Sequence, residues 1–295
     1  MSTEAYASLL AHMGHRVRRV GNVYWYDGTW RVYTSFPLQN AVDPCALDLC
    51  AVLCSDGLVA RFPCPLEAGR PSHRFTCDAT NYGMEHLSPR TRGQTRRGLE
   101  RCSVRPVKLE ELLSQGSCLN RETLARQGRK VPVGFEEYWA RFHRRAFETE
   151  GADIWGAFVD GALAAYLVAF CMEGCASIVI VRSGSRWLEH YPNNALLFTY
   201  MKEKLSESAI REVSIGLESV QPGMETLERF KRHMGFRKLE IGQRIELAPW
   251  LRPLVRRPVA KALGRLIQPR VRGNELLGKL SGMLSWYGEQ PSLRR

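Results

Sequence analysis

A lysine lies on the inward face of the helix expected in ETLERFKRHMGFRKLEI, which starts at Glu225. Leu227, Phe230 and Met234 recur at the spacing of one helical face, so the pattern predicts that they point into a core. Lys231 shares that face. Such a lysine either lays its stem along apolar surface with its ammonium in water, or places a cation inside a cleft. A buried ammonium can stabilise an oxyanion, or donate a proton if burial lowers its pKa.

A second candidate for proton chemistry is Glu218, in SIGLESVQPG after the strand expected at REVSIG. A carboxylate at this edge can accept the proton of an attacking amine or hydroxyl. The alternative is an ordinary solvated loop acid, and the sequence leaves both interpretations open.

Candidate anion-binding groups surround the start of the helix expected at 193–206, in IVRSGSRWLEHYPNNALLF. Free backbone N–H groups and the helix dipole favour an anion there. Asn193 and Asn194 would serve such a site, or simply cap the helix. Arg182, at a strand end, and Arg186 are the expected phosphate partners.

Five arginines fall in SPRTRGQTRRGLERC, which reads as a helix with Ser88 as N-cap and Pro89 at its first position. Arg90, Arg97 and Arg101 lie on one face of it. That face suits the phosphates of a donor or an anionic acceptor. A solvated helix face is an equally good interpretation.

Aromatic residues crowd the stretch NVYWYDGTWRVY. Asp27-Gly28 between two β-forming runs predicts a hairpin. Trp25 and Trp30 could line an acceptor cleft, although packing of one side of the hairpin on a core is the commoner arrangement.

Composition limits the classes of function. The chain has 295 residues, 44% of them apolar, no secretory signal and no apolar run long enough for a membrane helix. The nine cysteines form no CxxC, so we expect free thiols, no metal site and a cytoplasmic protein. Residues 1–247 are nearly balanced in charge. This balance argues against a domain that coats nucleic acid. Residues 248–295 hold 10 basic and 2 acidic residues.

The order of expected elements positions these groups. A helix near 4–15, the hairpin, a helix at 46–53 and strands near 58–62 and 74–77 precede the arginine-rich helix. From residue 103 the pattern is a strand, helices at 109–114, 120–127 and 135–148, and three strands joined by Asp160-Gly161 and Glu173-Gly174. A helix, the strand REVSIG, the Lys231 helix and the strand RKLEIGQRIEL complete it.

This order, closing on F-K-x-x-x-G-F, resembles the GNAT acyltransferase domain over residues 103–247. The arginine-rich helix leading into the first strand narrows the resemblance to Fem-type transferases, built from two tandem GNAT-like halves. The resemblance implies an α+β fold with a mixed, mostly antiparallel twisted sheet flanked by helices. It also implies a shortened first half at 1–102 and a second half at 103–247, with residues 248–295 as a basic helical tail.

The resemblance also implies roles. Lys231 follows phenylalanine as in the Fem-like pattern, where ordinary GNAT enzymes often place a tyrosine as acid, so it would meet the oxyanion of the donor carbonyl. Glu218 would accept the proton. Arg182, Tyr191, Asn193 and Asn194, with Arg97 and Arg101, would bind the donor. YPNNAL lacks the glycine pair with which most GNAT enzymes bind coenzyme A.

The expected activity is transfer of an acyl or aminoacyl group from acyl-CoA or aminoacyl-tRNA to an amine or hydroxyl, without a tightly bound cofactor. The acceptor would be a small molecule, a peptide or a lipid-linked precursor. The alternative is a catalytically silent GNAT-fold scaffold.

The basic tail offers two short amphipathic helices within residues 249–287. They would either bind the anionic inner face of a membrane or pack their apolar faces on the body. Binding of tRNA by the same charge is a weaker alternative.

Overall fold

The chain folds into two compact units, each assembled from distant parts of the sequence. The computed structural model describes residues 3–221, 223–267 and 275–293. The first unit holds residues 3–9, 75–216 and 226–237, and the second holds residues 10–74, 217–225 and the described residues from 238 onward. These units differ from the division expected at residues 102 and 247. The reason lies in the last strand, which pairs with a strand of residues 59–64.

The first unit contains a mostly antiparallel sheet flanked by helices. Its strands follow the order β10-β9-β8-β7-β6, with the end of β5 beside β10. The bounds are β5 (Arg70–Cys77), β6 (Ser103–Pro106), β7 (Ala152–Val159), β8 (Ala162–Met172), β9 (Cys175–Ser183) and β10 (Glu212–Leu217). Asp160-Gly161 and Glu173-Gly174 form the two tight turns with positive φ at every residue. The predicted meander is confirmed.

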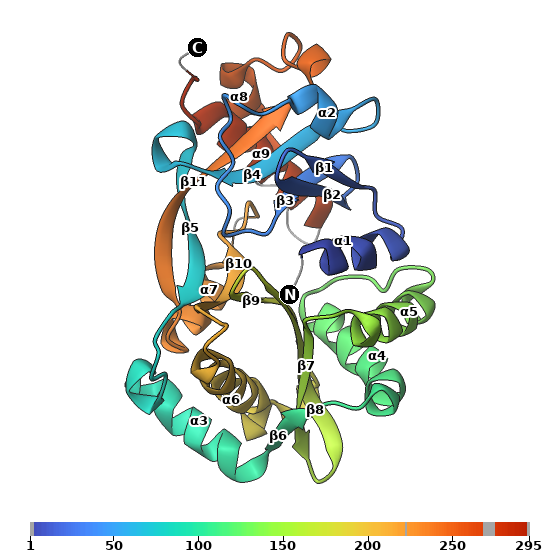
Figure 1. The fold of residues 1–295 in the computed structure, drawn as a ribbon, viewed down its shortest axis with the longest axis vertical. Helices are drawn as coiled ribbons and strands as arrows, with labels where there is room; N and C mark the ends of the chain where they lie inside the picture. The colour runs from blue at the N-terminus through green and yellow to red at the C-terminus, as the bar shows by residue number, and fades with distance from the viewer. Residues whose placement is uncertain (1–2, 222, 268–274, 294–295) are drawn as a thin grey trace. The chain divides into compact units, whose positions relative to one another are not determined.

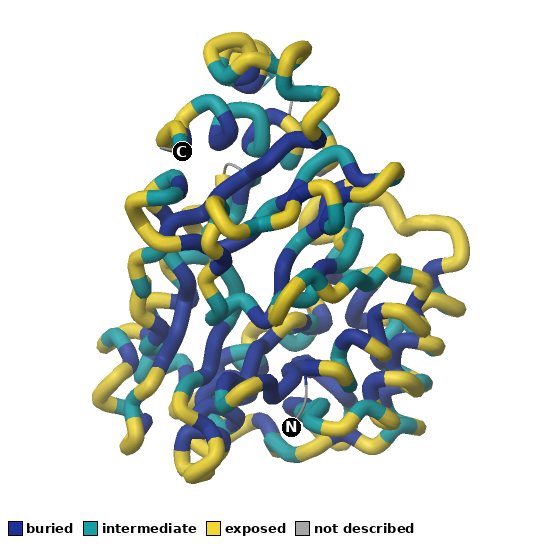
Figure 2. Tube along the Cα trace, turned by 45° about the horizontal axis from the view of Figure 1, so that its top comes forward, coloured by how far each residue is buried: buried dark blue, intermediate teal, exposed yellow. Residues whose placement is uncertain are grey.

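Helices cover both faces of this sheet. α6 with α3 packs on one face, and α4 with α5 packs on the other (Figure 1). The bounds are α3 (Pro89–Arg101), α4 (Leu109–Arg126), α5 (Phe135–Glu148), α6 (Pro192–Ser206) and α7 (Glu225–His233), with the short helices η2 (Met84–His86) and η3 (Ser185–His190). α1 (Thr3–His12) begins in this unit. Nearly every residue of β8 is buried, so the core of the unit follows this strand (Figure 2).

The prediction of two separate helices at 109–114 and 120–127 is wrong, because α4 runs through both. Gly116 lies in its interior, where a Cβ would come within 3.0 Å of His143 Cε1. The glycine therefore permits close packing of α5 on α4 and does not end the helix.

The second unit has the strand order β1-β2-β3-β4-β11-β5. Its elements are β1 (Val17–Val20), β2 (Val23–Thr29), β3 (Val32–Phe36), β4 (Val59–Cys64), β11 (Arg237–Leu247), α2 (Leu49–Leu53), η1 (Leu66–Ala68), η4 (Pro249–Leu251), α8 (Arg257–Ile267) and α9 (Glu275–Glu289). β11 lies antiparallel to β4, from Gly242 opposite Cys64 to Leu247 opposite Val59.

The hairpin β2-β3 turns at a different place from the one predicted. Asp27 and Gly28 lie inside β2, at an irregularity in its register with β3, and the turn falls at Trp30 and Arg31. The Asp27 carboxylate accepts a hydrogen bond from the Arg16 backbone N–H at 2.8 Å. This bond to the neighbouring segment holds Asp27 within the strand.

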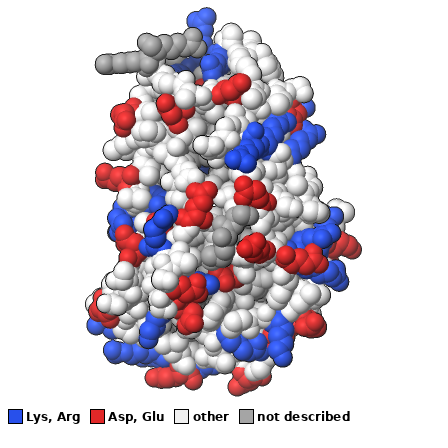
Figure 3. Space-filling view, in the orientation of Figure 1, with Lys and Arg blue, Asp and Glu red and all other residues white. Residues whose placement is uncertain are grey.

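The end of the chain packs on the body of the second unit. Trp286 and Tyr287 of α9 share a buried apolar cluster with Ile245 and Leu247 of β11. The Gln290 side chain bonds both the N–H and the C=O of Ile245, at 2.9 and 2.7 Å. On the face drawn in Figure 3, basic and acidic side chains are intermixed.

Candidate functional site

Lys231 is the buried residue of α7, and its ammonium lies inside the first unit. The side chain is 9% exposed, whereas Leu227, predicted to point inward, is 44% exposed. Nζ donates a hydrogen bond to the Ile215 carbonyl oxygen at 2.9 Å and lies 4.5 Å from the centre of the Phe75 ring. The lysine therefore does not extend its ammonium into water. The prediction that Leu227 points into the core is wrong.

The end of β10 explains why this carbonyl is available. β10 runs parallel to β9, and their ladder joins residues 212–214 to residues 175–177. β9 continues to Ser183, so the two strands part beyond Ser214. Gly216, with φ of 83°, turns the chain away at this point. Ile215 thus lies just past the ladder, where its carbonyl accepts from Lys231.

Lys231 loses its proton more readily than an exposed lysine, but it is charged below about pH 8. Burial lowers its pKa to about 8, and the carboxylate of Glu228 acts in the opposite direction. An ammonium has three N–H groups, and among the described residues only the Ile215 carbonyl accepts from it. Two of the three N–H groups therefore have no hydrogen-bond acceptor in the part of the chain that the structure describes.

Three arginines lie near the end of β9, the strand that continues after β10 has separated from it. Burial lowers the pKa of Arg182, at the end of β9, and the nearby guanidiniums of Arg129 and Arg126 lower it further against an opposing effect of Tyr166. Arg126 donates to the Ser183 carbonyl at 2.8 Å. Three neighbouring cations of this kind suit an anionic ligand.

The start of α6 offers less to an anion than the sequence suggested. The Asn193 amide donates to Ser183 Oγ at 3.0 Å. Asn194 is buried and its amide faces the sulfur of Met234, at 3.7 Å. The backbone carbonyl of Tyr191 accepts from the N–H groups of Asn194 and Ala195 at 3.1 and 3.2 Å. Pro192 has no N–H, so in this first turn only Asn193 has a backbone N–H without an acceptor among the residues that the structure describes.

The arginines of α3 lie at the surface of the first unit. Arg97 is exposed. Arg101 donates to the Glu189 carbonyl at 3.3 Å and lines an open hollow of about 470 Å³ with Arg105 and Asp160. Their donor-binding role therefore remains a prediction.

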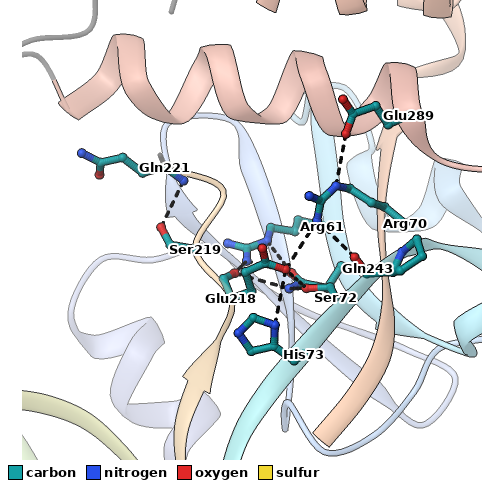
Figure 4. A network of polar contacts seen from close by, with 10 residues as sticks. Arg61, Arg70, Ser72, His73, Glu218, Ser219, Gln221, Gln243 and Glu289 are labelled. Atoms are coloured by element: carbon teal, nitrogen blue, oxygen red, sulfur yellow. Dashed lines mark hydrogen bonds and ion pairs between the residues drawn. The ribbon is translucent and has the colours of Figure 1, made fainter. Parts of the chain in front are cut away.

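Glu218, in the second unit, is held by a polar network (Figure 4). Its carboxylate accepts from Ser72 Oγ at 2.6 Å and from Arg70 Nη1 at 3.4 Å, with His73 Nδ1 at 3.7 Å. Its backbone carbonyl accepts from Arg61 Nη2 at 2.8 Å. Glu218 is thus not a freely solvated loop acid, because both its backbone and its side chain are fixed.

Arg61 adds a half-buried cation beside Glu218. Nε and Nη2 donate to Gln243 Oε1 at 3.0 and 2.7 Å, while Nη1 has no hydrogen-bond partner among the described residues. Burial lowers the pKa of Arg61 to about 10 although Tyr26 and Glu218 oppose the change. Arg61 and Glu218 line a pocket of about 390 Å³ that also includes Thr34 and Lys279.

The two tryptophans expected to contact an acceptor have different positions. Trp25 is completely buried and packs edge-on against Phe62, 5.5 Å between ring centres. Its acceptor-binding role is corrected to a core role, because a fully covered ring presents no surface to a ligand. Trp30 is 73% exposed at the hairpin turn, under the guanidinium of Arg31.

The sequence pattern did not predict a buried polar group that lies between α4, α5 and β8. Tyr166 donates to Asn120 Oδ1 at 2.6 Å and contacts His143 Nε2 at 3.3 Å. Burial lowers the pKa of His143 to about 4. In the described part of the chain, no cluster of three or more His, Cys, Asp or Glu residues could hold a metal ion.

Comparison with solved structures identifies the fold. No family model and no curated protein matches the sequence. FemX matches with a TM-score of 0.60 and 12% identity, over 85% of this chain and 92% of that one. The C-terminal domain of a putative lysylphosphatidylglycerol synthetase from Agrobacterium fabrum matches with a TM-score of 0.54 and 15% identity, over 83% and 88%. L-PGS from Bacillus licheniformis matches with 0.50 and 14%, over 90% and 97%. The chain therefore has the fold of the Fem-like GNAT proteins.

Proposed function

We propose that this protein transfers an acyl or aminoacyl group from an activated donor to an amine or hydroxyl acceptor. The observation that carries the proposal is the buried ammonium of Lys231 at the point where β9 and β10 part. A cation in a desolvated site stabilises negative charge that develops on a carbonyl oxygen. The resemblance to Fem-type transferases implies the carbonyl of an acyl or aminoacyl donor as the ligand.

In this reaction the acceptor attacks the carbonyl carbon of a thioester or ester. The new C–N or C–O bond forms, the carbonyl oxygen becomes an oxyanion beside Lys231, and the C–S or C–O bond to the donor then breaks. The proton that the nucleophile loses passes to a general base. Within the second unit, the carboxylate of Glu218 lies in a pocket, is oriented by Ser72 and has the chemistry of such a base. The open Nη1 of Arg61 in this pocket suits a carboxylate or phosphate group bound within the second unit.

The donor we favour is aminoacyl-tRNA. Only one free backbone N–H remains at the start of α6, so this helix end is poorly suited to hold a pyrophosphate through its amides. The guanidiniums of Arg182, Arg126 and Arg129 would instead bind backbone phosphates.

The test is an acyl-transfer assay with two donors. Purified protein is incubated with acetyl-CoA or with a mixed pool of aminoacyl-tRNA, together with amine acceptors that carry a carboxylate. We expect acceptor-dependent deacylation of the tRNA pool, lost in Lys231→Met. Transfer from acetyl-CoA alone would change the donor class. Failure of both donors across an acceptor panel would contradict the transferase and favour a silent scaffold.

A further inference from the structure

Helix α8 in the second unit is packed through its small residues. Ala260 and Gly264 are its buried positions. Ser281 Oγ of α9 donates to the Gly264 carbonyl at 2.8 Å, and a Cβ on Gly264 would collide with Ser285 Oγ and with the Ser281 carbonyl. The two helices are therefore in close backbone contact, and the contact uses little apolar surface of α8.

The large apolar side chains of this helix point the other way. Val259, Leu263 and Leu266 recur at helical spacing and are exposed, Leu266 at 62%. Leu254 and Trp250, just before the helix, are exposed at 70% and 61%. Apolar surface in water is costly at about 25 cal/mol per Å². We call these five residues the outward apolar face.

Basic side chains border this face. Arg256 and Arg265 are exposed, and their guanidinium groups have no hydrogen-bond or ion-pair partner among the described residues. Arg252 and Arg257, by contrast, are held by Glu246 and by the Gln290 carbonyl. Across residues 248–295, 10 basic residues stand against 2 acidic ones.

We propose that the outward apolar face is a docking surface for an anionic lipid bilayer. Leucine, valine and tryptophan would enter the boundary between headgroups and acyl chains while Arg256 and Arg265 meet anionic headgroups. Two other occupants fit this face less well. A second copy of the chain would bring like charges together, and a bound nucleic acid would leave the apolar side chains in water. In the described part of the chain no helix is long and apolar enough to cross a bilayer, so the contact is one of a helix lying on the surface. This inference does not depend on the proposed transferase activity.

The experiment is co-sedimentation of the full-length protein with vesicles. Vesicles of phosphatidylcholine with about one third phosphatidylglycerol are compared with pure phosphatidylcholine, at low and at about 0.5 M salt. We expect binding to anionic vesicles that weakens with salt. The double substitution Leu263→Gln/Leu266→Gln should weaken it by at least tenfold, because two leucine side chains would no longer enter the apolar phase.

The matched control is Leu188→Gln/Leu227→Gln, since both of these leucines are about as exposed as Leu263 but belong to other elements. This control should bind as the unchanged protein does. Arg256→Gln/Arg265→Gln should reduce binding to anionic vesicles and leave thermal stability unchanged. Equal binding by the Leu263/Leu266 variant and its control would overturn the proposal. The proposal would also be overturned if the protein failed to bind vesicles but formed a dimer in light scattering that only the Leu263/Leu266 variant abolished.

Discussion

The Lys231 ammonium and the Ile215 carbonyl, 2.9 Å apart, replace a bond that a neighbouring strand would otherwise supply. Ile215 lies one residue past the ladder between β10 and β9. A buried carbonyl needs a donor, and here the donor comes from the next helix along the chain. The separation of the two strands thus leaves the Ile215 carbonyl to Lys231.

Loss of the Lys231 ammonium should abolish turnover and preserve the fold. Lys231→Met keeps an apolar stem of similar length, so we expect kcat to fall about 10²–10³-fold, as when an oxyanion donor is removed. Lys202→Met, on the exposed side of α6, is the control and should keep full activity. Steady-state transfer assays with far-UV circular dichroism decide this, and an active Lys231→Met would end the assignment.

The rate of transfer should fall as the pH rises above about 8. The pKa of Lys231 is lowered to about 8 by burial, so its charged form is present below that pH and lost above it. Arginine stays charged over the accessible range, so Lys231→Arg should retain part of the activity and lose this alkaline limb. If Lys231 instead acts as a proton donor, Lys231→Arg should be inactive at every pH.

Acid should destabilise the protein through His143. Its pKa is lowered by burial from 6.5 to about 4. Between pH 6.5 and pH 4 the imidazole of His143 is therefore protonated in the unfolded chain but not in the folded protein. The stabilisation from His143 is fully present above pH 6.5 and is lost as the pH falls towards 4. The loss amounts to about 3 kcal/mol. Urea unfolding across this range should give a visibly smaller slope for His143→Gln, and an unchanged slope would assign the acid sensitivity elsewhere.

Donor binding should depend on the Arg182 group. A charge-assisted hydrogen bond contributes about 1.5–3 kcal/mol, so Arg182→Gln should raise the KM for a phosphate-bearing donor about tenfold or more with little change in kcat. The exposed Arg144 provides the control substitution Arg144→Gln. The difference between the two variants should shrink at high salt. A fall in kcat alone would point to a structural role for Arg182.

Elements defined by local periodicity were predictable, and those defined by distant partners were not. The meander β7-β8-β9 and helix α6 follow from alternation and turn residues. The break predicted within α4 failed, because Gly116 serves a contact with His143 that no local pattern encodes. The turn predicted at Asp27-Gly28 failed for the same reason, since Arg16 holds Asp27 in the strand.

The same distinction applies to the candidate site. The helical spacing that drew attention to Lys231 correctly predicted a buried lysine, although it wrongly placed Leu227 in the core. The hydrogen bonds of Arg61 were not predictable from its neighbours in sequence, because they involve Gln243 and Glu218, far along the chain. A feature that could have pointed to it is its place in a strand, Val59–Cys64, where the other residues of the run are mostly apolar.

The pairing of β4 with β11 also sets the order in which the second unit can be completed during synthesis. β4 leaves the ribosome about 190 residues before the strand that covers its edge. At about 5–20 residues per second, this edge waits on the order of ten to forty seconds for its partner. Until then β4 has β3 as its neighbour on one side alone, and an uncovered strand edge is a template for unwanted pairing. We therefore expect chaperones to protect the nascent chain until β11 has emerged.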